Sequence, residues 1–160
     1  PGWKVLITMD GDGQHVPGDI PYLVEAYEQT GADIVVGTRD FTLPGIPFLR
    51  RWSNQRSSRW IGKKTNLPLT DFQSGYRLFS RRAVQMLAPR MTGGLFELET
   101  SMLILADRLG LQITECPITT IYDRDSSKKS SWRAIRDSRR IYRAVKKTLK
   151  ECEYLLPESE

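Results

Sequence analysis

Cysteine and histidine are scarce in this 160-residue sequence, which contains two cysteines and one histidine. Cys116 and Cys152 lie far apart, without the close spacing of metal ligands and without a neighbouring histidine. This pattern argues against a disulfide framework and against a zinc site of cysteine and histidine ligands. Such sparse use of cysteine is typical of a reducing compartment, so we expect a cytoplasmic location.

Long hydrophobic runs are absent as well. No stretch reaches the roughly 18 to 20 uninterrupted apolar residues that a membrane-spanning helix needs. The first ten residues, PGWKVLITMD, lack the layout of a cleavable signal. We therefore expect that the chain does not cross a membrane. With 39% hydrophobic and 27% charged residues, the composition is that of one globular domain or a large piece of one.

Acidic residues are rare in one segment, from Arg124 to Lys150. The segment contains eleven basic and two acidic residues, a local balance of +9, whereas the whole chain carries +5. A basic block of this kind suits nucleic acid, anionic lipid or a phosphorylated substrate, and it is equally typical of a solvated helix face. Nucleic acid is the weakest of these partners, because aromatic residues do not interleave with the basic ones as a stacking platform requires.

The order of the predicted elements indicates an α/β fold. The apolar run over residues 3–9 predicts a buried parallel strand that ends in an Asp-Gly-Asp-Gly turn. Asp19, Pro21 and Gly31 are typical of the cap, the first turn and the stop of a helix. A second buried strand is predicted over residues 33–37, so strand, helix and strand follow one another.

The rest of the chain predicts further helices and short strands. Ser80 is placed to cap a short helix that ends near Leu87, after a loop and strand that begin at Asp71. Pro117 interrupts a β-branched segment, which predicts two short strands or one strand at a sheet edge. Further helices are predicted over residues 48–62, 97–109 and 131–151, and the interrupted β-branched segment covers residues 112–122.

Two aspartates, Asp10 and Asp12, follow the first predicted strand. Residues two apart in extended backbone point to the same side, so the two carboxylates converge where open α/β sheets place their ligands. Such a pair suits a hard divalent cation, because Mg²⁺ is typically held by one or two carboxylates together with substrate phosphates. The alternative is an ordinary Asp-Gly turn. His15 is a metal ligand, a residue that orients Gln14, or a solvated loop residue.

Four motifs in a fixed order carry a family resemblance: Met9-Asp-Gly-Asp-Gly-Gln-His, Gly37-Thr-Arg, Asp71-Phe-Gln-Ser-Gly-Tyr-Arg and Phe96-Glu-Leu-Glu. They resemble the family 2 glycosyltransferases, most closely the dolichol-phosphate mannose synthase-like, or polyprenyl-phosphate glycosyltransferase, branch. The resemblance implies a glycosyltransferase A-type (Rossmann-like) sheet with flanking helices. In that family the aspartate pair closes the nucleotide-binding half, so the chain looks like the second half, with the N-terminal nucleotide-binding half missing.

The chain is expected to divide into three parts, of which the resemblance accounts for the first. Residues 1–130 look like the metal- and acceptor-binding half of the catalytic domain. Residues 131–151 form a basic amphipathic helix, and residues 152–160 are a tail. The divalent metal implied by the family is Mg²⁺ or Mn²⁺. Asp10, Asp12 and Gln14 look like the residues that bridge it to the diphosphate of a nucleotide-sugar donor.

The resemblance also implies roles for individual residues on the acceptor side. Arg39 and Arg124 resemble the arginines that meet the phosphates, and Arg51 matches a basic position of the acceptor loop. Asp71 looks like the carboxylate nearest the reacting groups, within an acceptor motif that also includes Ser74, Gly75 and Arg77. The alternatives are structural, with Arg39 an ordinary surface arginine and Arg77 a partner of Asp71.

The implied reaction is inverting transfer of a sugar from a nucleotide-sugar donor to a polyprenyl phosphate. The metal would neutralise charge on the departing diphosphate. A phosphate acceptor is already largely ionised near neutral pH, since its second pKa is about 6, and it needs no strong base. A saccharide hydroxyl would need one, and Asp71 is then the candidate. A chain that is inactive by itself and a non-catalytic basic binding module are the remaining interpretations.

The last predicted helix has an apolar stripe surrounded by basic residues. A helix of this composition can lie on an anionic membrane surface, which would bring a lipid-linked acceptor to the site at the cytoplasmic face. Alternatively, the stripe packs on the domain and the charges are solvated. The stripe consists of Trp132, Ile135, Tyr142, Val145 and Leu149.

Overall fold

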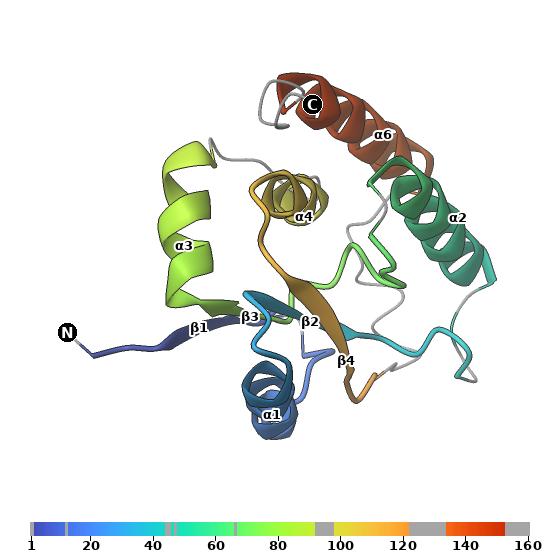
Figure 1. Ribbon diagram of the computed structural model, residues 1–160. Helices are drawn as coiled ribbons and strands as arrows, with labels where there is room; N and C mark the ends of the chain where they lie inside the picture. The colour runs from blue at the N-terminus through green and yellow to red at the C-terminus, as the bar shows by residue number, and fades with distance from the viewer. Residues whose placement is uncertain are drawn as a thin grey trace.

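A computed structural model of the chain shows one mixed β-sheet with helices on both faces (Figure 1). It describes residues 2–11, 13–43, 46, 48–65, 67–91, 98–121 and 134–152. Asp12 and Arg124, two residues of the predicted site, therefore lie outside the described residues.

The secondary structure follows the predicted order, with boundaries that differ by a few residues. The strands are β1 (Val5–Thr8), β2 (Ile34–Thr38), β3 (Arg77–Ser80) and β4 (Ile113–Pro117). The helices are η1 (Pro17–Asp19), α1 (Ile20–Thr30), α2 (Phe48–Thr65), α3 (Arg81–Leu87), η2 (Ala88–Arg90), α4 (Leu98–Arg108) and α6 (Ala134–Glu151). The predicted α/β fold is confirmed.

The described sheet has the strand order β1-β3-β2-β4. β3 is antiparallel to both of its neighbours, whereas β2 and β4 are parallel. The prediction of a buried parallel strand over residues 3–9 is wrong, because β1 lies at an edge and pairs with the antiparallel β3. Leu6 is accordingly 46% exposed and Met9 43% exposed. β4 forms the opposite edge of the described sheet, and Pro117 is its last residue, as an edge position allows.

Local signals set several of the boundaries. The Ser80 hydroxyl accepts a hydrogen bond from the Ala83 amide at 3.0 Å, which caps α3 as predicted. Gly31 ends α1 with a left-handed φ of 64°. Asp19 occupies the predicted cap position of α1, but its carboxylate does not cap the helix. It accepts instead from the amide of Thr119 at 2.7 Å and from the hydroxyl of Thr119 at 3.0 Å.

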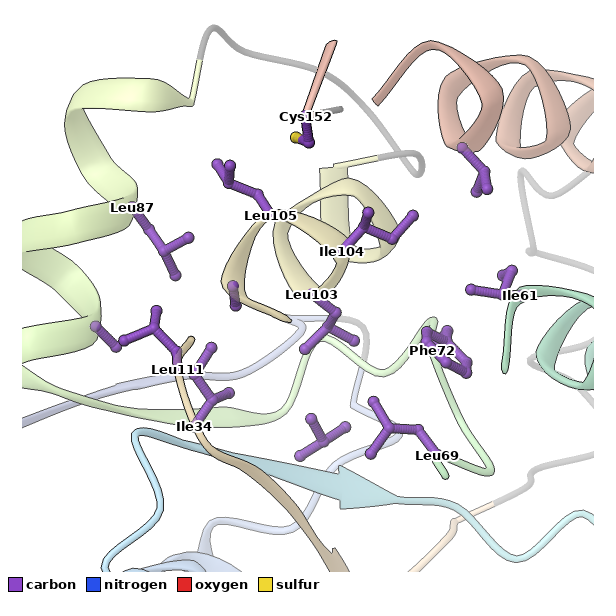
Figure 2. Packing of buried hydrophobic residues seen from close by; sticks show 14 of the residues in the cluster. Ile34, Ile61, Leu69, Phe72, Leu87, Leu103, Ile104, Leu105, Leu111 and Cys152 are labelled. Atoms are coloured by element: carbon purple, nitrogen blue, oxygen red, sulfur yellow. The ribbon is translucent and has the colours of Figure 1, made fainter. Parts of the chain in front are cut away.

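Apolar residues fill both sides of the sheet. On one side, α4 supplies Leu103 and Ile104, which pack with Ile34 of β2 and with Phe72 (Figure 2). On the other side, Val35 packs in a smaller cluster with residues of α1 and β4. Because alternate residues of β2 face opposite clusters, the strand reads in the sequence as a continuous apolar run.

Helix α6 packs against α4 and α2, so it shares the main core with the sheet (Figure 1). Ile141 and Val145 are buried in this core, and Leu149 packs against it. Of the predicted apolar stripe, Val145 and Leu149 therefore pack on the domain, whereas Trp132 and the side chain of Ile135 lie outside the described residues. Tyr142, a predicted member of that stripe, is instead 44% exposed. None of the helices in the described part of the chain is long and apolar enough to span a membrane.

Candidate functional site

The loop over residues 71–76 crosses the carboxyl ends of β1 and β2 before the chain enters β3. The Thr8 hydroxyl donates to the carbonyl oxygen of Gly75 at 2.9 Å. From β2, the Gly37 amide donates to the carbonyl oxygen of Tyr76 at 2.8 Å. Three of the four sequence motifs thus meet at one end of the sheet, as expected for ligand sites in open α/β sheets.

Glycine is required where the loop meets the end of β1. A Cβ atom at position 75 would lie 2.7 Å from Asp10 Cγ and 2.8 Å from Asp10 Oδ2. Any side chain there would displace the carboxylate. Gly37 is similarly confined, since a Cβ atom would lie 2.9 Å from Ile118 Cγ2 and 3.0 Å from the Tyr76 carbonyl oxygen. The two glycines therefore allow Asp10, β2 and the loop to approach one another closely.

His15 is buried beside Asp10, so the prediction of a solvated loop histidine is wrong. The Asp10 amide donates to His15 Nδ1 at 3.3 Å, and the same nitrogen lies 3.7 Å from Asp10 Oδ2. The imidazole packs on the Tyr76 ring with the centroids 5.1 Å apart. Tyr76 in turn donates from its hydroxyl to the Val16 carbonyl oxygen at 3.1 Å. His15 thus holds the turn at Asp10 against the acceptor motif.

Arg39 and Asp71 form a two-pronged ion pair. Arg39 Nε donates to Asp71 Oδ2 at 2.7 Å, and Nη2 donates to Oδ1 at 3.0 Å. The Asp71 side chain is 1% exposed and that of Arg39 is 11% exposed. The Arg39 guanidinium also lies over the Phe41 ring, 5.1 Å from its centroid. Paired donors of this kind fix both distance and orientation. The structure therefore brings together two residues for which the motifs predict separate tasks.

Arg77 lies beneath the loop and holds it from within. Its guanidinium donates to the carbonyl oxygens of Ser74 at 2.8 Å, Phe72 at 3.0 Å and Glu99 at 2.8 Å. The predicted alternative, in which Arg77 is the partner of Asp71, is wrong because Asp71 is paired with Arg39. Burial lowers the pKa of Arg77 to about 10, against an opposing effect of nearby carboxylates, so the side chain is charged at neutral pH.

Ser74 is fully buried as well, and its hydroxyl accepts from the Tyr76 amide at 3.3 Å. This local bond tightens the turn that leads into β3. The side chains of Ser74 and Arg77 thus lie inside the loop, whereas their predicted role was contact with the acceptor.

Glu115 of β4 is a site residue that the sequence reasoning missed. Its Oε1 atom accepts from the Thr70 amide at 2.5 Å and from the Asp71 amide at 3.3 Å. The Thr70 hydroxyl lies 3.1 Å from each carboxylate oxygen of Glu115. A lone carboxylate in a mainly apolar strand was the available signal. The Glu115 carboxylate holds the start of the loop to the edge strand β4.

Arg51 is exposed in the first turns of α2. Hydrogen bonds from the Thr42 hydroxyl and amide lower the pKa of Asp40, and the charge of Arg51 lowers it further. Arg51 therefore lies near the segment that follows Arg39.

Gln14 is half-buried, and its main-chain carbonyl oxygen accepts a hydrogen bond from the Ile121 amide at 3.4 Å.

The donor chemistry at Asp10 suits a hard divalent cation. Its side chain is 44% exposed and supplies carboxylate oxygens, which Mg²⁺ and Mn²⁺ prefer. Within the described residues, no three His, Cys, Asp or Glu side chains converge as a metal site. Asp12, the second predicted carboxylate ligand, lies outside those residues.

Comparison with protein families settles the class of this arrangement. The family model for glycosyl transferase family 2 matches residues 3–87, more than half of the chain. The chain belongs to glycosyl transferase family 2. The matched residues include the turn at Asp10, the strand β2 with Arg39, and the whole loop over residues 71–76. The family resemblance predicted from the four motifs is confirmed.

Two named relatives act on polyprenyl phosphates, as their names state. A UDP-N-acetylglucosamine–dolichyl-phosphate N-acetylglucosaminyltransferase of Methanococcus voltae is 32% identical over 124 residues, which are 76% of this chain and 49% of that protein. An undecaprenyl-phosphate mannosyltransferase of Micrococcus luteus is 34% identical over 128 residues, which are 75% of this chain and 50% of that protein. The chain thus spans about half the length of these relatives.

Solved structures confirm the glycosyltransferase A-type fold. A glucosyl-3-phosphoglycerate synthase of Mycobacterium tuberculosis in complex with phosphoglyceric acid has a TM-score of 0.62 and 18% identity, covering 99% of this chain and 52% of that one. The same enzyme with Mn²⁺, UDP-glucose and phosphoglyceric acid has a TM-score of 0.59 and 17% identity, with the same coverage. At 17–18% sequence identity, the similarity to these structures shows the fold alone.

Proposed function

We propose that this chain contributes the metal- and acceptor-binding half of a glycosyltransferase that moves a sugar, with inversion, from a nucleotide-sugar donor to a polyprenyl phosphate. The supporting observation is that the Asp10 carboxylate lies against Gly75, so the predicted metal ligand and the predicted acceptor loop are in contact. The names of the dolichyl-phosphate and undecaprenyl-phosphate relatives support this class of acceptor.

On the donor side, Asp10, together with Asp12 and Gln14, would hold a divalent metal at the diphosphate. The bound metal would supply charge neutralisation as the nucleoside diphosphate departs. Arg39 and Arg124 would add positive charge near the phosphates. Because Asp71 fixes the Arg39 guanidinium through two hydrogen bonds, that charge is held in place before the donor arrives.

On the acceptor side, the hydrogen bonds that the Asp71 carboxylate already accepts favour a phosphate nucleophile over a hydroxyl nucleophile. Both of its carboxylate oxygens accept hydrogen bonds from Arg39, and Oδ1 also accepts from the Gln73 amide at 3.1 Å. A carboxylate held in this way is poorly placed to remove a proton from a hydroxyl. A phosphate acceptor needs no such step, because it is already largely ionised near neutral pH.

The remaining predicted residues receive more specific roles. Arg51, which is exposed beside the segment after Arg39, would meet the acceptor phosphate. Ser74 and Arg77 would act as positioning residues that keep the loop, and therefore Asp71 and Gly75, at the end of the sheet. A polyprenyl phosphate is anchored in a bilayer, so the site would work at the cytoplasmic face of a membrane.

Transfer assays on the full-length protein that contains this chain would test the proposal. The assays would combine labelled nucleotide sugars, Mg²⁺ or Mn²⁺, and either a polyprenyl phosphate or a soluble saccharide. Asp10→Asn and Asp12→Asn should each reduce transfer by roughly 100-fold or more, a typical loss for removing electrostatic stabilisation. Asp107→Asn, at the far end of α4, is the matched control and should leave transfer unchanged.

Three outcomes would contradict the proposal. Full activity in excess chelator would show that transfer needs no divalent metal. Undiminished transfer by Asp10→Asn would show that Asp10 is not needed as a metal ligand. A preference for the saccharide hydroxyl over every polyprenyl phosphate would make Asp71 the expected general base and would overturn the assignment of the acceptor.

A further inference from the structure

Positive charge is concentrated on two helices that lie side by side, α2 and α6 (Figure 1). The Trp60 ring of α2 and the Tyr142 ring of α6 pack with their centroids 4.7 Å apart. Helix α2 contains six basic residues and no acid, and α6 contains seven basic residues and two acids, a combined balance of +11. Since the whole chain carries +5, the remainder carries −6. The charge of the molecule is therefore strongly polarised.

Helix α2 has a buried stripe and an exposed stripe. Asn54, Ser58, Ile61 and Thr65 recur at helical spacing and are all buried. The opposite stripe begins with two exposed aromatic residues, Phe48 at 79% and Trp52 at 48% exposure. It continues with Arg56, whose guanidinium lies 5.2 Å from the Trp52 ring centroid, and then with the exposed Arg59 and Lys63.

Helix α6 contributes charge to this surface but little apolar area. Its apolar residues Ile141 and Val145 are buried in the core and cannot enter a bilayer. Its outward stripe consists of exposed Arg139, Arg143, Lys146 and Lys150. The most exposed aromatic residues of this surface therefore come from α2, and α6 adds Tyr142, which is 44% exposed.

We propose that the outward stripes of α2 and α6, together called the α2–α6 face, dock on an anionic lipid surface, with Phe48 and Trp52 entering the bilayer interface. Aromatic side chains favour the interface, and each Lys or Arg near an anionic surface strengthens binding. The inference rests on the proposed function, because a lipid-linked acceptor requires an approach to the membrane. It assigns this approach to residues that the family motifs do not include.

The order of residues on this face fits delivery of the acceptor to the site. Phe48 begins α2 nine residues after Arg39, and the charge of Arg51 acts on Asp40 next to Arg39. The aromatic end of the face thus follows the Arg39 segment along the chain. Nucleic acid fits less well, because its platforms alternate aromatic and basic residues along a groove. On the outward stripe of α2, the two aromatic residues Phe48 and Trp52 stand together at one end.

Binding of the full-length protein to vesicles would test the proposal. The vesicles would contain phosphatidylcholine alone or phosphatidylcholine mixed with phosphatidylglycerol. Arg59→Gln combined with Arg143→Gln should weaken binding to the mixed vesicles about 25-fold, since each charge contributes about fivefold. The matched control, Lys4→Gln combined with Arg90→Gln, removes two exposed charges elsewhere and should bind like the wild type.

The aromatic contribution requires its own pair of variants. Phe48→Ser combined with Trp52→Ser should weaken binding at high salt as well as at low salt, because apolar insertion is not screened. Ile20→Ser combined with Tyr22→Ser changes exposed residues of α1, on the other side of the sheet (Figure 1), and should have no effect. Unchanged melting temperatures would verify that each variant is folded.

Transfer to a short, water-soluble polyprenyl phosphate separates this inference from the proposed function. Variants of the α2–α6 face should keep that activity and lose transfer to the membrane-embedded acceptor. Wild-type vesicle affinity in both pairs of variants would overturn the docking surface even if transfer persists. Tighter binding of duplex oligonucleotides than of the mixed vesicles would overturn it in favour of a nucleic-acid surface. Absence of transfer to every acceptor, with vesicle binding intact, would overturn only the proposed function.

Discussion

Two buried aspartates pair with arginines at opposite ends of β2, and their surroundings differ. At the start of the strand, Asp33 accepts from Arg82 Nη1 at 2.6 Å, from the Ser80 hydroxyl at 3.0 Å and from the Gln112 amide at 3.1 Å. Its arginine is 57% exposed. Beyond the other end, Asp71 pairs with Arg39, which is only 11% exposed. The same pair of residue types thus fastens elements together at one end and fixes a buried charge at the other.

Glycines also distinguish the two ends of β2. At the Asp71 end, Gly75 and Gly37 remove side chains where the backbone and the Asp10 carboxylate come close. At the Asp33 end, the contacts come from ordinary caps and strand termini. Close approach and a fully engaged charge pair are typical of a site built to receive a ligand, whereas a half-exposed arginine at a junction is typical of structure.

The largest effect is expected for Gly75→Ala. The new Cβ would displace the Asp10 carboxylate, so transfer should fall by roughly 100-fold and affinity for Mn²⁺ should fall with it. Gly18→Ala is the control, because a Cβ there would meet only Val16 Cγ1 at an ordinary 3.5 Å. Steady-state rates and metal titration would check both variants. Normal metal affinity in Gly75→Ala would contradict the contact between Asp10 and the loop.

Next in size is Asp71→Asn, which leaves a nearly buried Arg39 charge without its carboxylate. Breaking such a pair costs about 3 kcal/mol of the free energy of unfolding, and transfer should fall at least tenfold because Arg39 loses its orientation. Denaturant unfolding and transfer rates would be measured together. A variant that loses stability but keeps full transfer would show that both ends of β2 are merely structural.

Asp33→Asn should show the opposite balance. Loss of the charged acceptor for Ser80, Arg82 and the Gln112 amide should lower the free energy of unfolding by about 1–3 kcal/mol. The rate of transfer by the folded protein should be unchanged, because this end of β2 is remote from Asp10 and Asp71. A large drop in transfer below the melting transition would contradict the comparison.

The smallest effect is expected for Arg82→Gln. Since this side chain is more than half exposed, its ion pair should contribute at most about 1 kcal/mol, and less at high salt. Arg39→Gln is the comparison, because its partner would be left fully buried, and it should destabilise the fold more and slow transfer as well. Equal losses of stability in the two variants would remove the distinction that burial makes.

Sequence patterns predicted most of the fold, because they are local. Hydrophobic period, the cap at Ser80 and the glycine at position 31 located the helices and strands to within a few residues. The antiparallel insertion of β3 between β1 and β2 was not predictable in this way, since strand pairing depends on contacts between distant segments. For the same reason the antiparallel pairing of β1 with β3 was missed.

The motifs also predicted which residues gather at the site, but not what each one contacts. Asp71, Ser74 and Gly75 do lie in one loop beside Asp10, and Arg77 begins the strand β3 that follows it. The side chain of Asp71 contacts Arg39, whereas those of Ser74 and Arg77 lie inside the loop, and this difference depends on burial that spacing does not encode. Glu115 was missed because its partners are backbone amides more than forty residues away along the chain.

The central claim is that Asp10 and the loop over residues 71–76 act as one unit in sugar transfer. A double-mutant cycle with Asp10→Asn and Gly75→Ala in the full-length protein tests it most directly. Because the proposed effect of Gly75→Ala is to displace Asp10, the double variant should transfer sugar no more slowly than Asp10→Asn alone. Losses that multiply in the double variant would show that the two positions act independently and would contradict the account.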